Sequence, residues 1–220
     1  MTDAAATLTV WGRGNAYNVQ KVLWTLDELG LAFTHLDAGG AAGGLDSPDF
    51  LRLNPHARIP VLADGENVIW ESNSIVRYLA AAYGADTLYR TDPAERSLAE
   101  RWMDWELATL QPDFIDLFWG YYRTPEAQRD TPAIDRAAAR CAGHFNILDA
   151  HLAGQDYLAG AVFGMGDIPA ATALHRYFTM GLPTPALPHV RGWYRRLGQR
   201  PAFRRRIMQP YEDLRGRTTF

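Results

Sequence analysis

Short β-rich runs alternate with amphipathic segments in the first third of the chain. Residues 7–11 form an apolar, β-branched run that predicts a strand, and two glycines follow it closely. The apolar positions of residues 19–29 recur at three- and four-residue spacing, which predicts a helix that stops at Gly30. Residues 32–36 predict a weaker strand, and the Gly- and Ala-rich residues 37–44 predict a loop.

A second group of strands leads to another helix. Residues 59–63 and 68–70 are β-rich runs, and the Asp64-Gly65 pair between them is a typical hairpin signal. Ser72 then opens a segment whose apolar positions share one helical face. The order strand–helix–strand, then strand–strand–helix, predicts an α/β domain over residues 1–84.

The remainder of the chain is predicted to be helical. Residues 85–92 lack periodicity and are interpreted as a linker between two domains. Long helices are expected from Asp92-Pro93 and from Thr131, and shorter ones after Asp167, Pro188 and Pro201. Residues 93–220 therefore form an all-α domain in this interpretation.

Composition and charge narrow the function classes. The formal net charge of −3 argues against binding to nucleic-acid phosphates, and the arginine-rich segment near the C-terminus is interpreted as a solvated helix face. There is no long apolar run that predicts a transmembrane helix, and residues 1–6 lack the pattern of a secretory signal. Cys141 is the single cysteine, which excludes CxxC redox pairs and fits a reducing cytoplasm.

Four segments of this chain, taken together, resemble the cytosolic glutathione transferase superfamily. They are residues 11–24 (WGRGNAYNVQKVLW), 54–62 (NPHARIPVL), 70–79 (WESNSIVRYL) and 163–169 (FGMGDIP). The resemblance implies a thioredoxin-like N-terminal domain that binds glutathione and an all-α C-terminal domain that supplies the electrophile pocket. It also implies a cytoplasmic homodimer with glutathione as co-substrate, a small hydrophobic electrophile as second substrate, and no metal.

Two dipeptides carry most of the expected glutathione binding. Ile59-Pro60 stands where this family has a cis proline, and X–Pro bonds are the ones that adopt the cis form cheaply. A cis bond there turns the main chain of Ile59 outward, so an extended peptide can pair with it as an added strand. Glu71-Ser72 begins a helix, where a carboxylate and an ammonium group of the γ-glutamyl part can be bound.

The glycyl carboxylate of glutathione needs a cation or hydrogen-bond donor. Arg58 is the favoured candidate because it adjoins the cis-proline position, and His56 and Arg52 are alternatives. Many relatives use a basic residue after the second strand, but residues 37–44 contain none.

The thiol of glutathione must be stabilised as a thiolate to react near pH 7. Its free pKa is near 8.5, and one hydrogen bond to a charged group, worth about 1.5–3 kcal/mol, lowers it sufficiently. By the resemblance, Ala16 replaces the serine of serine-type relatives. Asn18 falls at the position where an asparagine-type bacterial and fungal group uses an asparagine side-chain amide to stabilise the thiolate. Asn18 is the favoured donor, with Tyr17 and Asn15 as secondary candidates and Arg13 as an electrostatic helper. The alternative role for the two asparagines is helix capping.

The electrophile pocket and the dimer contact are also inferred from the resemblance. Residues that follow the first helix of the second domain are expected to face the thiol, and the alternative is ordinary helix–helix core. The candidates are Trp119, Tyr121, Tyr122, Arg123 and Tyr177. Arg101 and Asp104 lie on the helix that forms the dimer contact in relatives, and Asp104 is expected to reach the partner's γ-glutamyl ammonium.

The sequence thus predicts conjugation of the glutathione thiolate to a small electrophile. Dehalogenation, peroxide reduction and disulfide reduction with glutathione at the same site are the alternatives within the enzyme class. The alternative of another class is a non-catalytic glutathione-fold module that binds ligands or proteins, which the missing serine at Ala16 favours. The Ile59-Pro60 and Glu71-Ser72 pairs favour the enzyme, because a pure scaffold has no need of them.

Overall fold

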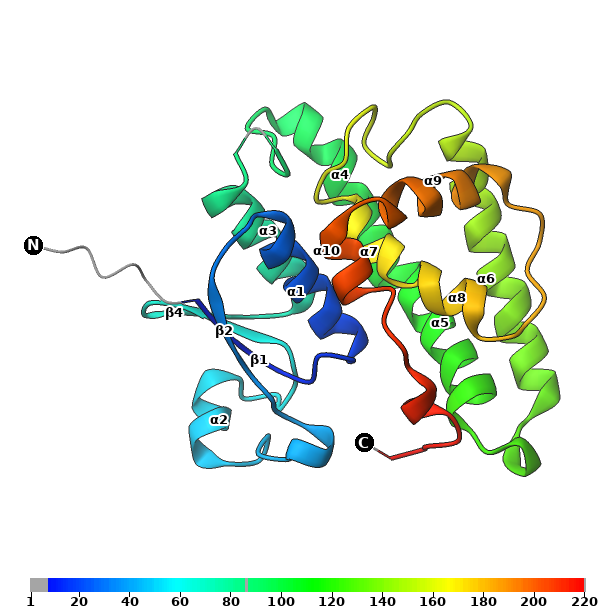
Figure 1. Cartoon of the computed structure of the whole chain (residues 1–220), viewed down its shortest axis with the longest axis horizontal. Coiled ribbons are helices and arrows are strands. Elements are labelled where there is room, and N and C mark those ends of the chain that lie inside the picture. The colour runs from blue at the N-terminus through cyan, green and yellow to red at the C-terminus, as the bar shows by residue number, and fades with distance from the viewer. Residues whose placement is uncertain (1–7, 86, 220) are drawn as a thin grey trace, which may run out of the picture.

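The computed structural model describes residues 8–85 and 87–219 and consists of a mixed α/β part and a helical part (Figure 1). Residues 1–6 and the expected strand start at Thr7 lie outside the described residues. The elements of the first part are β1 (Leu8–Trp11), α1 (Tyr17–Glu28), β2 (Phe33–Leu36), α2 (Pro48–Leu53), β3 (Val61–Asp64), β4 (Asn67–Trp70) and α3 (Ser72–Tyr83).

The four strands form one mixed sheet in the order β2-β1-β3-β4. Strands β1 and β2 are parallel, and α1 supplies the crossover that a parallel pair requires. Strand β3 pairs antiparallel with β4, as the hairpin signal predicts, and also antiparallel with β1. Val10 and Leu62 pack with Leu23 of α1 on one face, whereas Phe50 of α2 packs with Val61 on the other. The sheet is therefore covered by α1 and α3 on one side and by α2 on the other.

Helix α2 is the one α-helix of residues 8–85 that the apolar spacing does not predict; a 3-10 turn at Gly40–Ala42 lies within the predicted loop. Helix α2 has six residues and buries only Phe50, so it is too short to show a helical period. Its start signal is local: the side chain of Ser47 accepts a hydrogen bond from the backbone N–H of Phe50, and Pro48 occupies the first helical position.

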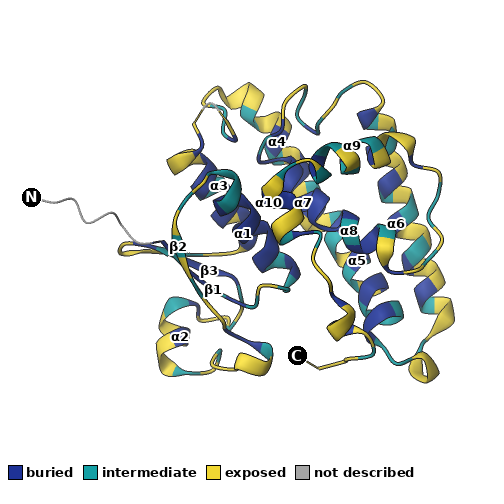
Figure 2. Ribbon diagram, viewed as in Figure 1, coloured by how far each residue is buried: buried dark blue, intermediate teal, exposed yellow. Residues whose placement is uncertain are grey.

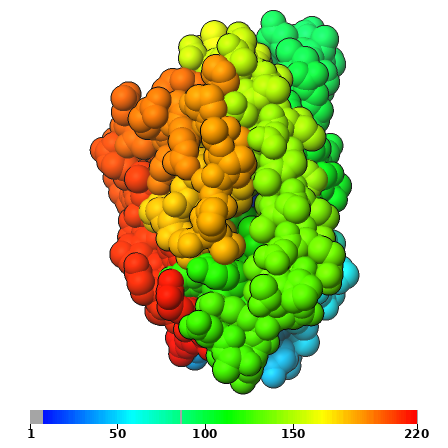
Figure 3. Space-filling view, turned by 90° about the vertical axis from the view of Figure 1, so that its right-hand side faces the viewer, coloured from blue at the N-terminus to red at the C-terminus, as the bar shows by residue number. Residues whose placement is uncertain are grey.

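The second part is helical, as predicted. Its helices are α4 (Pro93–Trp105), α5 (Gln111–Leu117), α6 (Thr131–Leu152), α7 (Asp167–Thr172), α8 (Leu174–Thr179), α9 (Pro188–Gly198) and α10 (Pro201–Arg206). All residues of α7 are buried, and this helix contacts α1 and α4, so it lies at the centre of the molecule (Figure 2). Figure 3 shows the outer face of this part, where α6 lies beside α9. We propose residues 85–92 as the linker because α3 ends at Tyr83 and α4 begins at Pro93.

Two π-helical segments interrupt the long helix that begins with α4. Residues Glu106–Leu110 join α4 to α5, and residues Phe118–Arg123 follow α5. A π-helical turn contains an extra residue, so it rotates the side chains after it relative to an uninterrupted helix. The second segment contains four of the residues predicted to line the electrophile pocket, and the apolar spacing gives no sign of either segment.

The arginine-rich C-terminal segment is only partly the solvated face that the sequence predicts, because Arg191, Arg195 and Arg204 are exposed but Arg200 and Arg206 are half-buried. Arg200 pairs with Glu28 of α1 at 2.7 Å, and Arg206 pairs with Asp27 at 2.8 Å. The two carboxylates are largely buried, and α10 packs against α1. These arginines therefore join the two domains, because the C-terminal helices return to the outer side of α1.

Gly12 illustrates how closely α1 approaches the loop before β3. Its φ is +145°, and a Cβ atom there would lie 2.5 Å from Cγ2 of Val19 and 3.1 Å from Cβ of Ile59. We expect Gly12→Ala to lower the free energy of unfolding by about 2 kcal/mol, from overpacking and backbone strain. Urea unfolding measures the loss.

Gly14→Ala is the matched control for this change. Its φ is not positive, and an added Cβ would meet only His35, at 3.6 Å. Equal losses in the two variants would contradict the close approach at Gly12.

Candidate active site

Two adjoining cavities lie between the domains, and Arg13, Asn18 and Ile59 belong to the walls of both. The larger cavity has a volume of about 400 Å³, and the smaller one about 180 Å³. The larger cavity is bounded by the loop after β2, the loop before β3, the start of α3 and two residues of the helical part. The smaller cavity lies between the start of α1 and the α5 region.

The peptide bond between Ile59 and Pro60 is cis, as the sequence predicts. The ladder between β1 and β3 begins at Val61, so the main chain of Ile59 lies outside it, at the cavity wall. Asn54, which is 2% exposed, holds the preceding loop because its side-chain amide donates to the carbonyl of Arg58 at 2.8 Å. The loop is thereby positioned along the larger cavity.

Glu71 and Ser72 line the larger cavity where α3 begins. Glu71 has a φ of 68°, a conformation that non-glycine residues rarely adopt and that is often found at functional sites. Ser72 is the first residue inside α3 and not its cap, which answers the alternative that it only caps its own helix. The free N–H groups and the dipole of this helix start favour an anion beside Ser72.

The three candidates for the glycyl carboxylate lie in different places. Arg58 lines the larger cavity. The ring of His56 instead packs edge-on against Trp70, with centroids 5.1 Å apart, and the guanidinium of Arg52 pairs with Asp49 on the exposed surface. Neither His56 nor Arg52 lines the cavity, so the structure favours Arg58 and corrects the expectation for His56.

Arg58→Ala is expected to raise the KM for glutathione by about three- to tenfold. The corresponding loss of binding free energy is smaller than the roughly 1.5–3 kcal/mol that a charge-assisted hydrogen bond contributes, because solvent screens an exposed guanidinium. Steady-state kinetics with glutathione as the varied substrate measure the change. Arg52→Ala and His56→Ala are the matched controls, and a larger rise in either of them than in Arg58→Ala would reassign the cation.

Three candidate donors for the thiolate stand at the start of α1, and the structure separates them. Ala16 is the N-cap residue, so neither asparagine caps the helix. The Asn15 amide donates to Asp213 at 3.1 Å, and the Tyr17 hydroxyl donates to Glu106 at 2.9 Å. Burial, together with the carboxylate of Glu106, raises the pKa of Tyr17 well above its ordinary value.

Asn18 differs from both of these candidates. Its amide makes no hydrogen bond with any other described residue, although its oxygen is buried. Asn18 also lies in the walls of both cavities, at their junction. An unengaged amide at this point is available to a ligand atom that bridges the two cavities.

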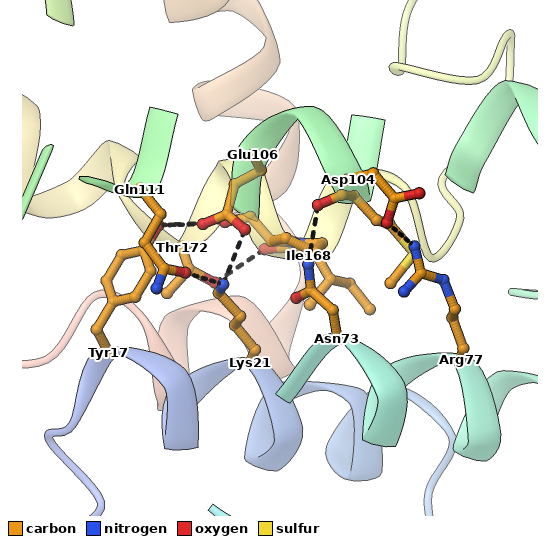
Figure 4. A network of polar contacts seen from close by, with 11 residues as sticks. Tyr17, Lys21, Asn73, Arg77, Asp104, Glu106, Gln111, Ile168 and Thr172 are labelled. Atoms are coloured by element: carbon orange, nitrogen blue, oxygen red, sulfur yellow. Dashed lines mark hydrogen bonds and ion pairs between the residues drawn. The ribbon is translucent and has the colours of Figure 1, made fainter. Parts of the chain in front are cut away.

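A buried ion pair lies behind this junction, and the motifs did not reveal it (Figure 4). Lys21, the only lysine of the chain, contacts Glu106 at 2.9 Å, and both side chains are fully buried. Lys21 also donates to Gln111 at 2.7 Å, while Glu106 accepts from Tyr17. Burial lowers the pKa of Lys21, and the charge of Glu106 opposes that shift. Gln111 lines the larger cavity and Tyr17 the smaller one, so this network supports both walls.

The wall of the smaller cavity corrects three of the five sequence-based candidates. Trp119 and Arg123 do line it. Tyr122 instead stacks on Phe118, with centroids 5.2 Å apart. Tyr121 and Tyr177 also lie outside the wall of the smaller cavity.

Tyr177 and Tyr121 pack against neighbours outside the cavity. The ring of Tyr177 stacks on Phe145 in the helical core at a centroid distance of 4.0 Å. Tyr121 lies under the guanidinium of Arg129, 4.6 Å from its ring centroid. The neighbour of Tyr177 in the sequence, Arg176, lines the smaller cavity in its place. Adjacent positions on a helix point in different directions, and the apolar spacing did not distinguish them.

The two residues expected at a dimer contact lie on α4. The guanidinium of Arg101 lies 5.9 Å from the ring centroid of Trp102. Asp104 pairs with Arg77 of α3 within the same chain (Figure 4). The role of Asp104 toward a second subunit stays a prediction.

None of the helices in the described ranges is both long and apolar enough to span a bilayer. Across residues 8–85 and 87–219, no group of three or more His, Cys, Asp or Glu side chains is arranged to hold a metal ion. Burial raises the pKa of Cys141 to about 12, so its thiol is unreactive at neutral pH.

A mixed four-stranded sheet with a cis proline beside a helical domain defines the fold of glutathione transferases. The family model for the glutathione S-transferase N-terminal domain matches residues 6–81, and the model for the C-terminal domain matches residues 131–196. The chain belongs to the glutathione S-transferase family. The expected thioredoxin-like and all-α domains are therefore confirmed.

Individual relatives agree with this assignment. Glutathione S-transferase GstB of Escherichia coli K12 is 43% identical over 205 residues, which cover 92% of this chain and 99% of the relative. Glutathione S-transferase 3 of Zea mays is 32% identical over 216 residues, which cover 92% of this chain and 94% of that relative. The crystal structure of the theta class enzyme from Xanthomonas axonopodis pv. citri with glutathione bound superimposes with a TM-score of 0.90 at 48% identity, covering 93% of this chain and 99% of that one.

Proposed function

We propose that this protein conjugates the thiolate of glutathione to a small hydrophobic electrophile. The observation that carries the proposal is the meeting of the two cavities at Asn18 and Ile59. The larger cavity has the volume and the polar groups for a tripeptide, and the smaller one is mainly lined by apolar and aromatic side chains. A thiol placed where they join faces the acceptor directly.

Four anchors of the larger cavity match the functional groups of glutathione. The main chain of Ile59 pairs with the cysteinyl residue as an added strand. Ser72 and the start of α3 bind the γ-glutamyl carboxylate, and Glu71 accepts hydrogen bonds from the ammonium group. Arg58 binds the glycyl carboxylate at the opposite end. This assignment uses both charged ends of the tripeptide and leaves the sulfur near α1.

The reaction then needs only a stabilised thiolate and a positioned acceptor. Asn18 donates its side-chain N–H to the sulfur, and the positive end of the α1 dipole adds to the stabilisation. The thiolate attacks the electrophilic carbon, a carbon–sulfur bond forms, and the leaving group departs with its electron pair. The thiol proton is released to solvent. Release of halide by this substitution is the same chemistry, so dehalogenation belongs to the proposed reaction.

The thiolate absorbance of bound glutathione, titrated against pH, tests the proposal. We expect a midpoint well below the value of about 8.5 for a free thiol. The same preparation should convert 1-chloro-2,4-dinitrobenzene to its glutathione conjugate far faster than glutathione alone. A midpoint at the free value with no conjugation would identify a ligand-binding module and overturn the enzyme assignment.

We further propose that the protein acts as a homodimer in the cytoplasm. Trp70 at the end of β4, Leu98 in α4 and Leu107 just after α4 are apolar side chains that remain 36–41% exposed in the single chain. A second copy of the chain would remove such side chains from water. Sedimentation equilibrium measures the mass in solution, and a monomer at micromolar concentration would contradict this part of the proposal.

A further inference from the structure

The smaller cavity combines apolar walls with an unusual number of cations. Arg13, Arg123 and Arg176 all belong to its wall. The carboxylate whose charge acts on all three is Asp213, which does not line the cavity. Three guanidinium groups therefore line one small space.

Arg176 is the most informative of the three because it is 6% exposed and has no ion-pair partner in the part of the chain that the structure describes. One nitrogen, Nη2, donates to the carbonyl of Asn15 at 2.6 Å and to Gln20 at 3.0 Å. Within the described residues, its other two nitrogens make no hydrogen bond. Burial lowers the pKa of Arg176 to about 10, so the group still carries its charge at neutral pH.

The protein holds Arg176 and Arg123 in fixed orientations. The guanidinium carbon of Arg176 lies 5.0 Å from the ring centroid of Phe118. Arg123, which is 2% exposed, donates to the carbonyls of residues 217 and 219 at 2.7 and 2.8 Å, and its guanidinium lies 4.0 Å from the ring centroid of Trp119. Arg176 is a buried cation without an ion-pair partner among the described residues, which is costly, and an anionic ligand would offset that cost.

The size of the space limits what such a ligand can be. Its volume is about 180 Å³, and an engineered apolar cavity of about 150 Å³ in another protein binds benzene. There is accordingly room for one six-membered ring with small substituents. Guanidinium groups bind carboxylates in planar, two-bonded geometry, which suits a ring that carries a carboxylate.

We propose that the electrophile is a single-ring molecule bearing a carboxylate, and that Arg176 binds this carboxylate in the smaller cavity. This inference rests on the proposed conjugation and specifies its substrate class. The thiolate attacks the ring carbon that bears the leaving group, the carbon–halogen bond breaks, and halide leaves with the electron pair. The carboxylate is unchanged and serves only to orient the ring and hold it beside the sulfur.

A matched pair of acceptors tests the inference on the unmodified protein. 4-Chloro-3-nitrobenzoate and 4-chloro-3-nitrobenzamide have nearly the same shape and differ in charge. Each kcat/KM is divided by the rate constant of the uncatalysed reaction with glutathione, because the two substituents activate the ring differently. We expect this ratio to be at least tenfold higher for the carboxylate. Equal ratios, or a preference for the amide, would overturn the inference.

Two variants of Arg176 identify the cation. In Arg176→Gln the preference for the carboxylate is expected to fall at least tenfold, and in Arg176→Lys part of it should return. The pKa of the bound thiol, read by absorbance, distinguishes this role from stabilisation of the thiolate. Equal losses for both acceptors together with a raised thiol pKa would assign Arg176 to the thiolate and overturn the inference.

Inhibition supplies a readout that needs no variant. 3-Nitrobenzoate is expected to inhibit conjugation of 1-chloro-2,4-dinitrobenzene at least tenfold more strongly than 3-nitrobenzamide does, in competition with the acceptor. Equal inhibition would contradict carboxylate binding in the smaller cavity. Absence of conjugation with every acceptor would instead count against the proposed function itself, so the two failures are distinguishable.

Discussion

Replacing Asn18 with alanine is expected to lower kcat/KM for conjugation at pH 7 by tenfold or more. Its amide makes no hydrogen bond within the described residues and stands where the two cavities join, whereas the amide of Asn15 and the hydroxyl of Tyr17 already have partners. A hydrogen bond to a thiolate is worth about 1.5–3 kcal/mol, and about 1.4 kcal/mol corresponds to a factor of ten. The pKa of the bound thiol should rise by about one unit or more, because the anion alone loses this bond.

Two further variants make this result specific. Asn18→Asp keeps the size of the side chain but presents a negative charge, so it should be less active than Asn18→Ala. Asn15→Ala removes an amide from the same helix start and is the matched comparison. Rates at saturating glutathione and the absorbance titration are measured for each variant, and the KM for glutathione should change little. Unchanged turnover in Asn18→Ala, or an equal rise of the thiol pKa in Asn15→Ala, would remove Asn18 from this role.

Lys21→Met is expected to destabilise the folded protein by about 3–5 kcal/mol, the range for removing one partner of a buried ion pair. Lys21 and Glu106 are fully buried, and the variant leaves the Glu106 carboxylate with the Tyr17 hydroxyl as its one remaining side-chain partner among the described residues. The free energy of unfolding from urea titration measures the loss. Because Gln111 and Tyr17 belong to the cavity walls, glutathione binding should weaken as well.

The double variant Lys21→Met/Glu106→Gln tests the electrostatic explanation. An amide at position 106 can still accept from Tyr17 and carries no charge, so the double variant should be more stable than Lys21→Met alone. Arg52→Met breaks an ion pair whose side chains are 71% and 86% exposed, and it should leave the urea midpoint nearly unchanged. A Lys21→Met protein as stable as the parent would show that the buried pair contributes no net stability.

Most of the fold could be predicted because its signals are local. The Asp64-Gly65 turn produces the β3–β4 hairpin, and Asp92 and Asp130 accept hydrogen bonds from backbone N–H groups of the helices that follow them. The main omission in the first domain, α2, is a helix of six residues, too short for its period to appear in the sequence.

The candidate site was predictable where the chain brings its own neighbours together. Ile59-Pro60 and Glu71-Ser72 are adjacent pairs, and their conformations depend mainly on the bond before proline and on the start of α3. The partner of Lys21 was not predictable in the same way. Lys21 meets Glu106 across 85 positions of sequence, and that meeting depends on how the two domains pack.

Local spacing was thus sufficient to identify two domains, their helices and strands, and the positions at which a tripeptide is held. Packing between distant segments settled which side chains surround the acceptor. Arg176 faces the smaller cavity while Tyr177 is stacked in the core, and the π-helical turn at Phe118–Arg123 places Trp119 and Arg123 on the cavity wall instead of Tyr121 and Tyr122. Neighbouring residues on a helix point about 100° apart, so the direction of each one depends on contacts that lie far away in the sequence.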